Sequence, residues 1–117
     1  MKNADPPYVQ VTIDCRELKD WDSYHDAFAA AFGFPDFYGR NMDAWIDCLT
    51  SLDVPDDGLT TVHAPQSGSV VLRLDHAKTF ATAFPDGYRA TLECAAFVNW
   101  RRVEAEEGPI LFVSFNE

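Results

Sequence analysis

Basic residues are scarce in this sequence. Nine lysines and arginines stand against 19 aspartates and glutamates, and the formal net charge is −10 at pH 7. A surface this acidic repels nucleic acid and anionic lipid, so we expect no direct binding to RNA, DNA or a membrane. It attracts basic proteins instead, although acidity that only confers solubility explains the same charge.

Cysteines are few, and long hydrophobic runs are missing. Cys15, Cys48 and Cys94 are an odd number and lie far apart in apolar segments, so we expect reduced, buried thiols. No Cys-x-x-Cys or His-x-x-x-His spacing predicts a metal site, and no glycine-rich loop predicts a phosphate or cofactor site. Because no apolar run could cross a bilayer and residues 1–7 lack the layout of a signal peptide, the expected location is the cytoplasm.

The hydrophobic content is nevertheless high enough for a packed core. Of the 117 residues, 47% are hydrophobic and 14% aromatic, which is typical of one globular domain spanning residues 1–117. Three segments have the pattern of strands: residues 8–14, 69–74 and 110–115. The last of these is apolar enough to be buried on both faces.

Helical patterns lie between these strands. They cover residues 20–32, 41–52, 75–84 and 85–106, whereas residues 59–64 are either a short edge strand or a loop. Strands separated by helices predict an α/β fold with a small, mainly parallel sheet packed by about four helices.

One stretch, "FPDFYGRNMDAWIDCLTSL" at residues 34–52, stands out as a turn followed by a helix with Asn41 as its N-cap. Helical spacing places Met42, Trp45, Leu49 and Leu52 on a core stripe. A different face carries Asp43, Asp47, Thr50 and an exposed aliphatic side chain, Ile46. No lysine or arginine within this helix is spaced to neutralise the two aspartates.

The acidic pair has several interpretations. An ordinary solvated helix face explains it without any function. A catalytic pair needs an enclosed, dry site, and one exposed helix of a small domain offers none. Cys48 as a nucleophile lacks an evident base. Helix capping and first-turn acids explain the cluster of Asp20, Asp22, His25 and Asp26 better than a cation site does.

The stretch resembles the hallmark segment of the barstar family, the intracellular inhibitors of barnase-like ribonucleases. In that family a Pro–acid–aromatic–aromatic–Gly turn leads to Asn, an apolar residue, Asp-Ala, and then Asp-Cys-Leu-Thr. Here these positions are residues 35–39, 41–44 and 47–50. The order of strands and helices on both sides agrees with the family as well.

The resemblance implies a three-stranded parallel sheet, no catalytic activity, and a helix that enters the nuclease active site. Asp47 would stand in for a substrate phosphate against the catalytic basic residues, and Asp43 would pair with another cation. The remaining partner contacts implied by the resemblance are Phe37, Tyr38, Gly39, Asn41, Ile46, Thr50, Ser51 and, late in the chain, Glu104.

Two departures from the family pattern concern the partner. Ile46 stands where the prototype inhibitor has a tryptophan, and Arg40 stands where it has an acid. We therefore expect a cognate nuclease other than barnase, with an acidic residue opposite Arg40.

The sequence is compatible with three hypotheses. The first is an inhibitor or immunity partner of a barnase-like or toxin-type ribonuclease, binding one-to-one as a monomer. The second keeps the same fold and helix but aims them at a different basic protein. The third is a small acid/base enzyme that uses Asp43 and Asp47.

Overall fold

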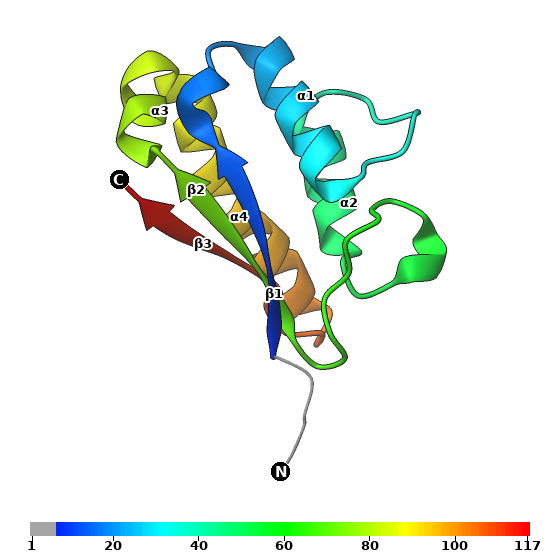
Figure 1. Cartoon of the computed structure of the whole chain (residues 1–117). Helices are drawn as coiled ribbons and strands as arrows, with labels where there is room; N and C mark the ends of the chain where they lie inside the picture. The colour runs from blue at the N-terminus through cyan, green and yellow to red at the C-terminus, as the bar shows by residue number, and fades with distance from the viewer. Residues whose placement is uncertain (1–6) are drawn as a thin grey trace.

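The computed structural model describes residues 7–117, so residues 1–6, on which the signal-peptide expectation largely rests, lie outside it. The elements in chain order are shown in Figure 1. They are β1 (Tyr8–Asp14), the 3-10 turn η1 (Cys15–Glu17), α1 (Trp21–Phe32), α2 (Met42–Thr50), the 3-10 turn η2 (Pro55–Asp57), β2 (Ser69–Asp75), α3 (Ala77–Ala83), α4 (Pro85–Glu104) and β3 (Leu111–Asn116).

The three strands form a parallel sheet in the order β1-β2-β3, which confirms the predicted fold class. The register places Val11, Leu72 and Val113 side by side across the sheet. The buried strand side chains all lie on the face of this row: Val11, Ile13, Val70, Leu72, Leu74 and Leu111. Successive side chains of a strand point to opposite faces of the sheet. The alternation of apolar and polar residues along each strand therefore determines which face of the sheet is buried.

The expectation that the last strand is buried on both faces is wrong. Phe112 is 44% exposed and Phe115 48% exposed. Phe112 shares its row with Gln10 and Val71 on the face opposite the core, and no helix of residues 7–117 covers that face. The apolar sequence of β3 therefore belongs to an edge strand with only one face turned to the core. It does not indicate that both faces of the strand are covered. The segment at residues 59–64, for which the sequence allows either a short edge strand or a loop, is a loop.

Helix α1 lies within the range predicted for it, residues 20–32, and has a cap at each end. Asp20 caps it, with its side chain accepting the backbone N–H of Ser23 at 2.9 Å while the Ser23 hydroxyl accepts in return from the backbone of Asp20. It ends at Gly33, whose φ of 70° suits glycine. The buried ring of Phe28 lies 5.7 Å from that of Trp45, and this contact joins α1 to α2.

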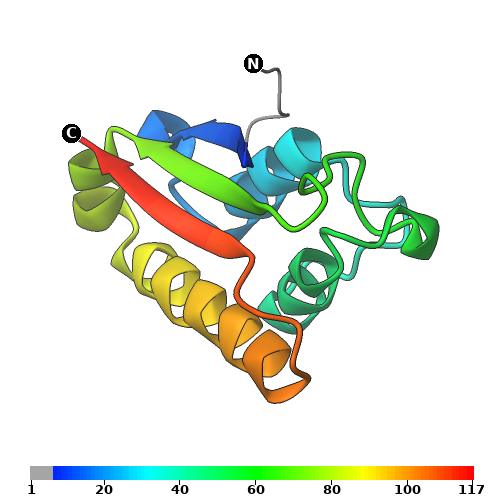
Figure 2. The ribbon, with the colours of Figure 1, turned by 90° about the horizontal axis from the view of Figure 1, so that it is seen from below.

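Helix α2 packs against α4, beside the C-terminal half of the long helix. Figure 2 shows α2 between α1 and α4 and farther from the sheet than either of them. Helix α4 is in turn fixed to β3 through Asn99, whose Oδ1 accepts the backbone N–H groups of Ile110 and Leu111 at 2.9 and 3.0 Å. The position of α2 therefore depends on α4.

The C-terminal ends of α2 and α4 are joined by Arg102, a buried arginine with 4% of its surface exposed. Its Nη1 and Nη2 donate to the two carboxylate oxygens of Asp53, each at 3.0 Å. Nη1 also donates to the carbonyl of Thr50 at 3.0 Å, in the last turn of α2. Nε and Nη2 donate to the carbonyls of Gly108 and Glu107 at 2.9 and 3.3 Å, beyond α4. One side chain thus satisfies carbonyls of both segments.

We predict that Arg102→Ala destabilises the protein by about 1.5–3 kcal/mol, because hydrogen bonds to a charged group are lost and carbonyls are left unpaired. Arg89→Ala is the matched control, since Arg89 makes only an exposed pair with Asp86, a kind worth about 0–1 kcal/mol. Urea unfolding of both variants measures the difference. Equal midpoints for the two variants would show that Arg102 does not hold the helix ends together.

Candidate functional site

The turn that precedes α2 is anchored by two buried aromatic rings. Phe34 and Tyr38 are each 9% exposed, with ring centroids 4.6 Å apart, and the backbone N–H of Tyr38 donates to the carbonyl of Pro35 at 2.9 Å. Phe37, between them, is 76% exposed. The turn therefore fixes its backbone from inside while it presents one aromatic side chain to solvent.

Asn41 begins α2 as predicted. Its Oδ1 accepts the backbone N–H of Ala44 at 2.8 Å, and its Nδ2 donates to the carbonyl of Gly39 at 3.4 Å. Both polar atoms of the Asn41 amide therefore make hydrogen bonds within the chain. Asn41 would influence the binding of a partner indirectly, by fixing where α2 begins.

Asp43 and Asp47 both point to the surface of α2. Asp43 is exposed and takes part in no ion pair within residues 7–117. Asp47 is different, because Nη1 of Arg101 on α4 donates to its Oδ1 at 2.9 Å. The expectation of a bare acidic pair is therefore wrong for Asp47, since its counter-ion comes from another helix rather than from its own.

Ile46 is buried, with 8% of its surface exposed, so the expectation of an exposed aliphatic residue on the acidic face is also wrong. Helix α4 packs against α2, and its Arg101 reaches Asp47, the residue that follows Ile46. Thr50, one turn later, is half-buried, and its hydroxyl donates to the carbonyl of Ile46 at 2.6 Å. Ser51, the C-cap residue, is half-buried, while Glu104 at the end of α4 is exposed.

Arg40 is neutralised within the chain. Its Nη1 donates to Asp26 at 2.9 Å, and its Nη2 lies 3.5 Å from Asp22, both on α1. The acids of the Asp20–Asp26 cluster thus cap α1 and hold Arg40. No group of three or more His, Cys, Asp or Glu side chains within residues 7–117 is arranged to hold a metal ion.

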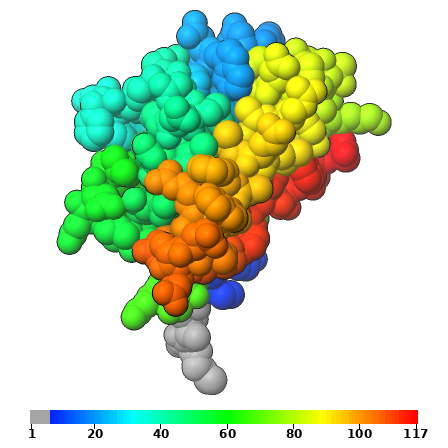
Figure 3. Space-filling model, turned by 180° about the vertical axis from the view of Figure 1, so that it is seen from behind, coloured from blue at the N-terminus to red at the C-terminus, as the bar shows by residue number. Residues whose placement is uncertain are grey.

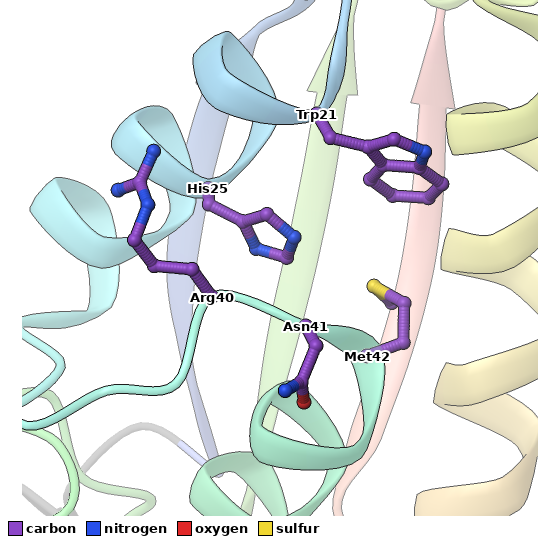
Figure 4. Close-up of a pocket in the computed structure, with 5 residues that line it drawn as sticks. All are labelled: Trp21, His25, Arg40, Asn41 and Met42. Atoms are coloured by element: carbon purple, nitrogen blue, oxygen red, sulfur yellow. The ribbon is translucent and has the colours of Figure 1, made fainter.

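A hollow of about 370 Å³ lies between α1 and the start of α2. Figure 4 shows Trp21 and His25 reaching into it from α1, opposite Asn41 and Met42. His25 is buried, and its Nδ1 shares a 2.7 Å hydrogen bond with the Tyr38 hydroxyl. Burial, and secondarily the charge of Arg40, lowers the pKa of His25. A second hollow of about 300 Å³ is lined by residues that include Phe37 of the turn and Asp47 of α2.

The thiols are inert in this setting. Burial raises the pKa of Cys48 to about 11 and that of Cys15 to about 12. Both are therefore protonated near neutral pH and are poor nucleophiles. The expectation of buried thiols is confirmed for these two, and Cys94 is half-buried.

Comparison with known proteins decides the family. The family model described as Barstar (barnase inhibitor) matches residues 8–114. The chain belongs to the Barstar family. It is also similar to a Bacillus subtilis (strain 168) protein named "Putative ribonuclease inhibitor YrdF", with 43% identity over 47 residues. That match covers 39% of this chain and 52% of the relative, so the chain spans about half the length of the curated relative that it matches.

Two ion pairs of this Barstar-family site could not be found from the sequence. Arg101 and Arg102 lie in a helix far along the chain, and nothing in their spacing names Asp47 or Asp53 as partners. The sequence does indicate the burial of His25, because this residue follows Tyr24 directly and lies about one helical turn before Phe28 in the aromatic stretch of α1.

No helix within residues 7–117 has both the length and the hydrophobicity needed to span a membrane.

We predict that the protein loses stability as the pH falls below about 6.5, the ordinary pKa of histidine. Because the folded pKa of His25 is lowered, the residue is neutral in both states above this pH, and below it the unfolded chain takes up the proton first. His25→Gln should flatten this slope, whereas His76→Gln should keep it. Unfolding midpoints between pH 5 and 8 test this, and equal slopes in all three proteins would refute it.

Proposed function

We propose that this protein inhibits a basic, barnase-like or toxin-type ribonuclease by placing the acidic face of α2 in the enzyme's active site. The observation that carries the proposal is the pair of exposed carboxylates, Asp43 and Asp47, on the segment that matches the Barstar family. Residues 1–117 would act as a single domain, as a monomer and in a one-to-one complex with the enzyme. An enzyme that binds RNA presents cations that an inhibitor can satisfy with carboxylates.

The fold supports this role by holding α2 still. Trp45 and Leu49 are fully buried beneath the helix, Asn41 caps its start, and Arg102 holds its last turn. Fixed carboxylates lose little conformational freedom on docking. We propose that Asp47 takes the place of a substrate phosphate and that Asp43 pairs with a second cation.

The residues around the acidic pair form two groups, one that could contact the partner and one that positions the surface from below. Phe37, Gly39 and Glu104 are exposed and free to touch a partner, and half-buried Thr50 and Ser51 border the same surface. Tyr38 and Ile46 lie beneath the surface, so we propose that they shape it from within. Asn41 acts through the helix start that it caps.

The internal ion pairs change the expected identity of the partner. Arg40 already has acidic neighbours in Asp22 and Asp26, so an inhibited enzyme needs no acid opposite it. Arg101 binds one oxygen of Asp47 and leaves Oδ2 without a hydrogen bond from residues 7–117. The partner's cation would therefore approach Oδ2. Because Arg101 weakens the acidic surface, a basic protein other than a ribonuclease remains the second candidate partner.

We predict that Asp47→Asn weakens inhibition roughly 30-fold or more, because truncating one partner of a buried charge pair typically costs about 2–5 kcal/mol, a range to which the barnase–barstar complex of this family itself contributes. Glu17→Gln, which neutralises one exposed carboxylate in η1, is the control. RNA cleavage by barnase and other basic ribonucleases is measured against inhibitor concentration. If the wild type inhibits none of them, the ribonuclease proposal fails.

A second test concerns Arg101. We predict that Arg101→Gln strengthens binding to a basic ribonuclease and speeds association at low salt, because it removes a cation beside Asp47. Arg89→Gln makes the same change in net charge on α4, at an arginine that pairs with Asp86. Association and dissociation rates of the two variants separate a local effect from the total charge. A gain no larger than that of Arg89→Gln would mean that Arg101 does not shield Asp47.

A further inference from the structure

Helix α4 exposes a pair of aromatic side chains. Phe97 is 44% exposed and Trp100 57% exposed. Their ring centroids lie 5.5 Å apart at an interplanar angle of 31°. The rings support each other while both remain on the surface. Exposed aromatic residues that lie together mark interaction sites more often than single ones do, and aromatic residues are enriched where protein partners meet.

Acidic residues flank this pair along the helix. Glu93, Phe97, Trp100 and Glu104 follow each other at spacings of four, three and four residues, which places them on one stripe of α4. All four are exposed, and neither glutamate takes part in an ion pair within residues 7–117. The stripe therefore combines two aromatic rings with two unpaired negative charges.

The stripe continues the acidic surface of α2. Arg101 follows Trp100 directly, lies one turn after Phe97, and binds Asp47 across the contact between the two helices. Figure 3 shows the orange and yellow atoms of α4 beside those of α2 on one face of the molecule. A partner that reaches Asp47 therefore meets α4 next to it.

We propose that Phe97 and Trp100 form a second docking site for the ribonuclease, and that lysine or arginine side chains of the enzyme pack on their rings between Glu93 and Glu104. This inference rests on the proposed function. A cation over a tryptophan ring is attracted by the ring's electrons, and nearby carboxylates strengthen that attraction. The flanking acids and the net charge of −10 repel a second copy of this chain and an anionic membrane, which leaves a basic protein as the occupant.

The site also supplies what α2 lacks. Trp45 and Ile46 are both buried, so α2 itself offers no large apolar side chain to a partner. Carboxylates alone give charge complementarity, whereas aromatic side chains provide contact area with few rotatable bonds. The aromatic pair on α4 would thus add packing to a surface on which Phe37, in the turn before α2, is also an exposed aromatic residue.

The test compares Phe97→Ala and Trp100→Ala with Phe112→Ala. Phe112 has the same exposed fraction as Phe97, 44%, but lies on the uncovered face of the sheet. The probe is a catalytically inactive form of whichever ribonuclease, barnase included, the wild type inhibits most tightly. We expect Kd to rise about tenfold for each α4 variant. The Phe112 variant should leave it unchanged, with thermal unfolding checked for all three.

Tryptophan fluorescence tests the contact directly. Trp45 is fully buried and Trp21 39% exposed, so Trp100 is the tryptophan most open to a neutral quencher such as acrylamide. Binding should reduce quenching in the wild type and change it much less in Trp100→Phe. The inference is overturned if Asp47→Asn weakens binding while all three alanine variants bind like the wild type, or if quenching does not fall on binding. If the wild type binds no ribonuclease, the proposed function fails and the second site fails with it.

Discussion

The arrangement of this protein depends on the bond network of one buried arginine. Arg102 joins the last turn of α2, the Asp53 carboxylate and the turn beyond α4. Helix α2 packs mainly on α4 rather than on the sheet, so this network fixes where its acidic face points. A buried guanidinium is costly unless its donors are satisfied, and here each of its three nitrogens has a partner within 3.0 Å.

Arginines recur at each boundary of the site, with different consequences. Arg102 is structural and buried, whereas Arg40 and Arg101 pair with surface carboxylates. Exposed pairs of this kind contribute little to stability, about 0–1 kcal/mol, and are screened by salt. Their larger effect is on recognition. Because Arg40 and Arg101 pair with carboxylates of this chain, a partner meets these arginines and their acidic neighbours already neutralised. The surface near α2 is therefore more neutral than the composition alone indicates.

The two halves of the molecule differ in how they meet solvent. The sheet packs its helices on one face and leaves the other open, with Phe112 exposed at the edge. The opposite side of the molecule carries α2, with its exposed aspartates, and α4, where two exposed aromatic rings lie between two exposed glutamates. Charged residues beside aromatic ones suit a partner that is both basic and structured. This asymmetry is why we place recognition on the α2–α4 side.

The sequence by itself determined the main strands and helices, the parallel α/β class, the cap at Asn41, and the stretch that marks the family, because these depend on local spacing and backbone chemistry. Tertiary structure decided which side chains of the site are free. Ile46 is buried although helical spacing groups it with exposed aspartates, and Asp47 is paired because Arg101, 54 residues later, comes within 2.9 Å. Helical periodicity specifies one helix face, but only the packing of distant segments specifies what covers it.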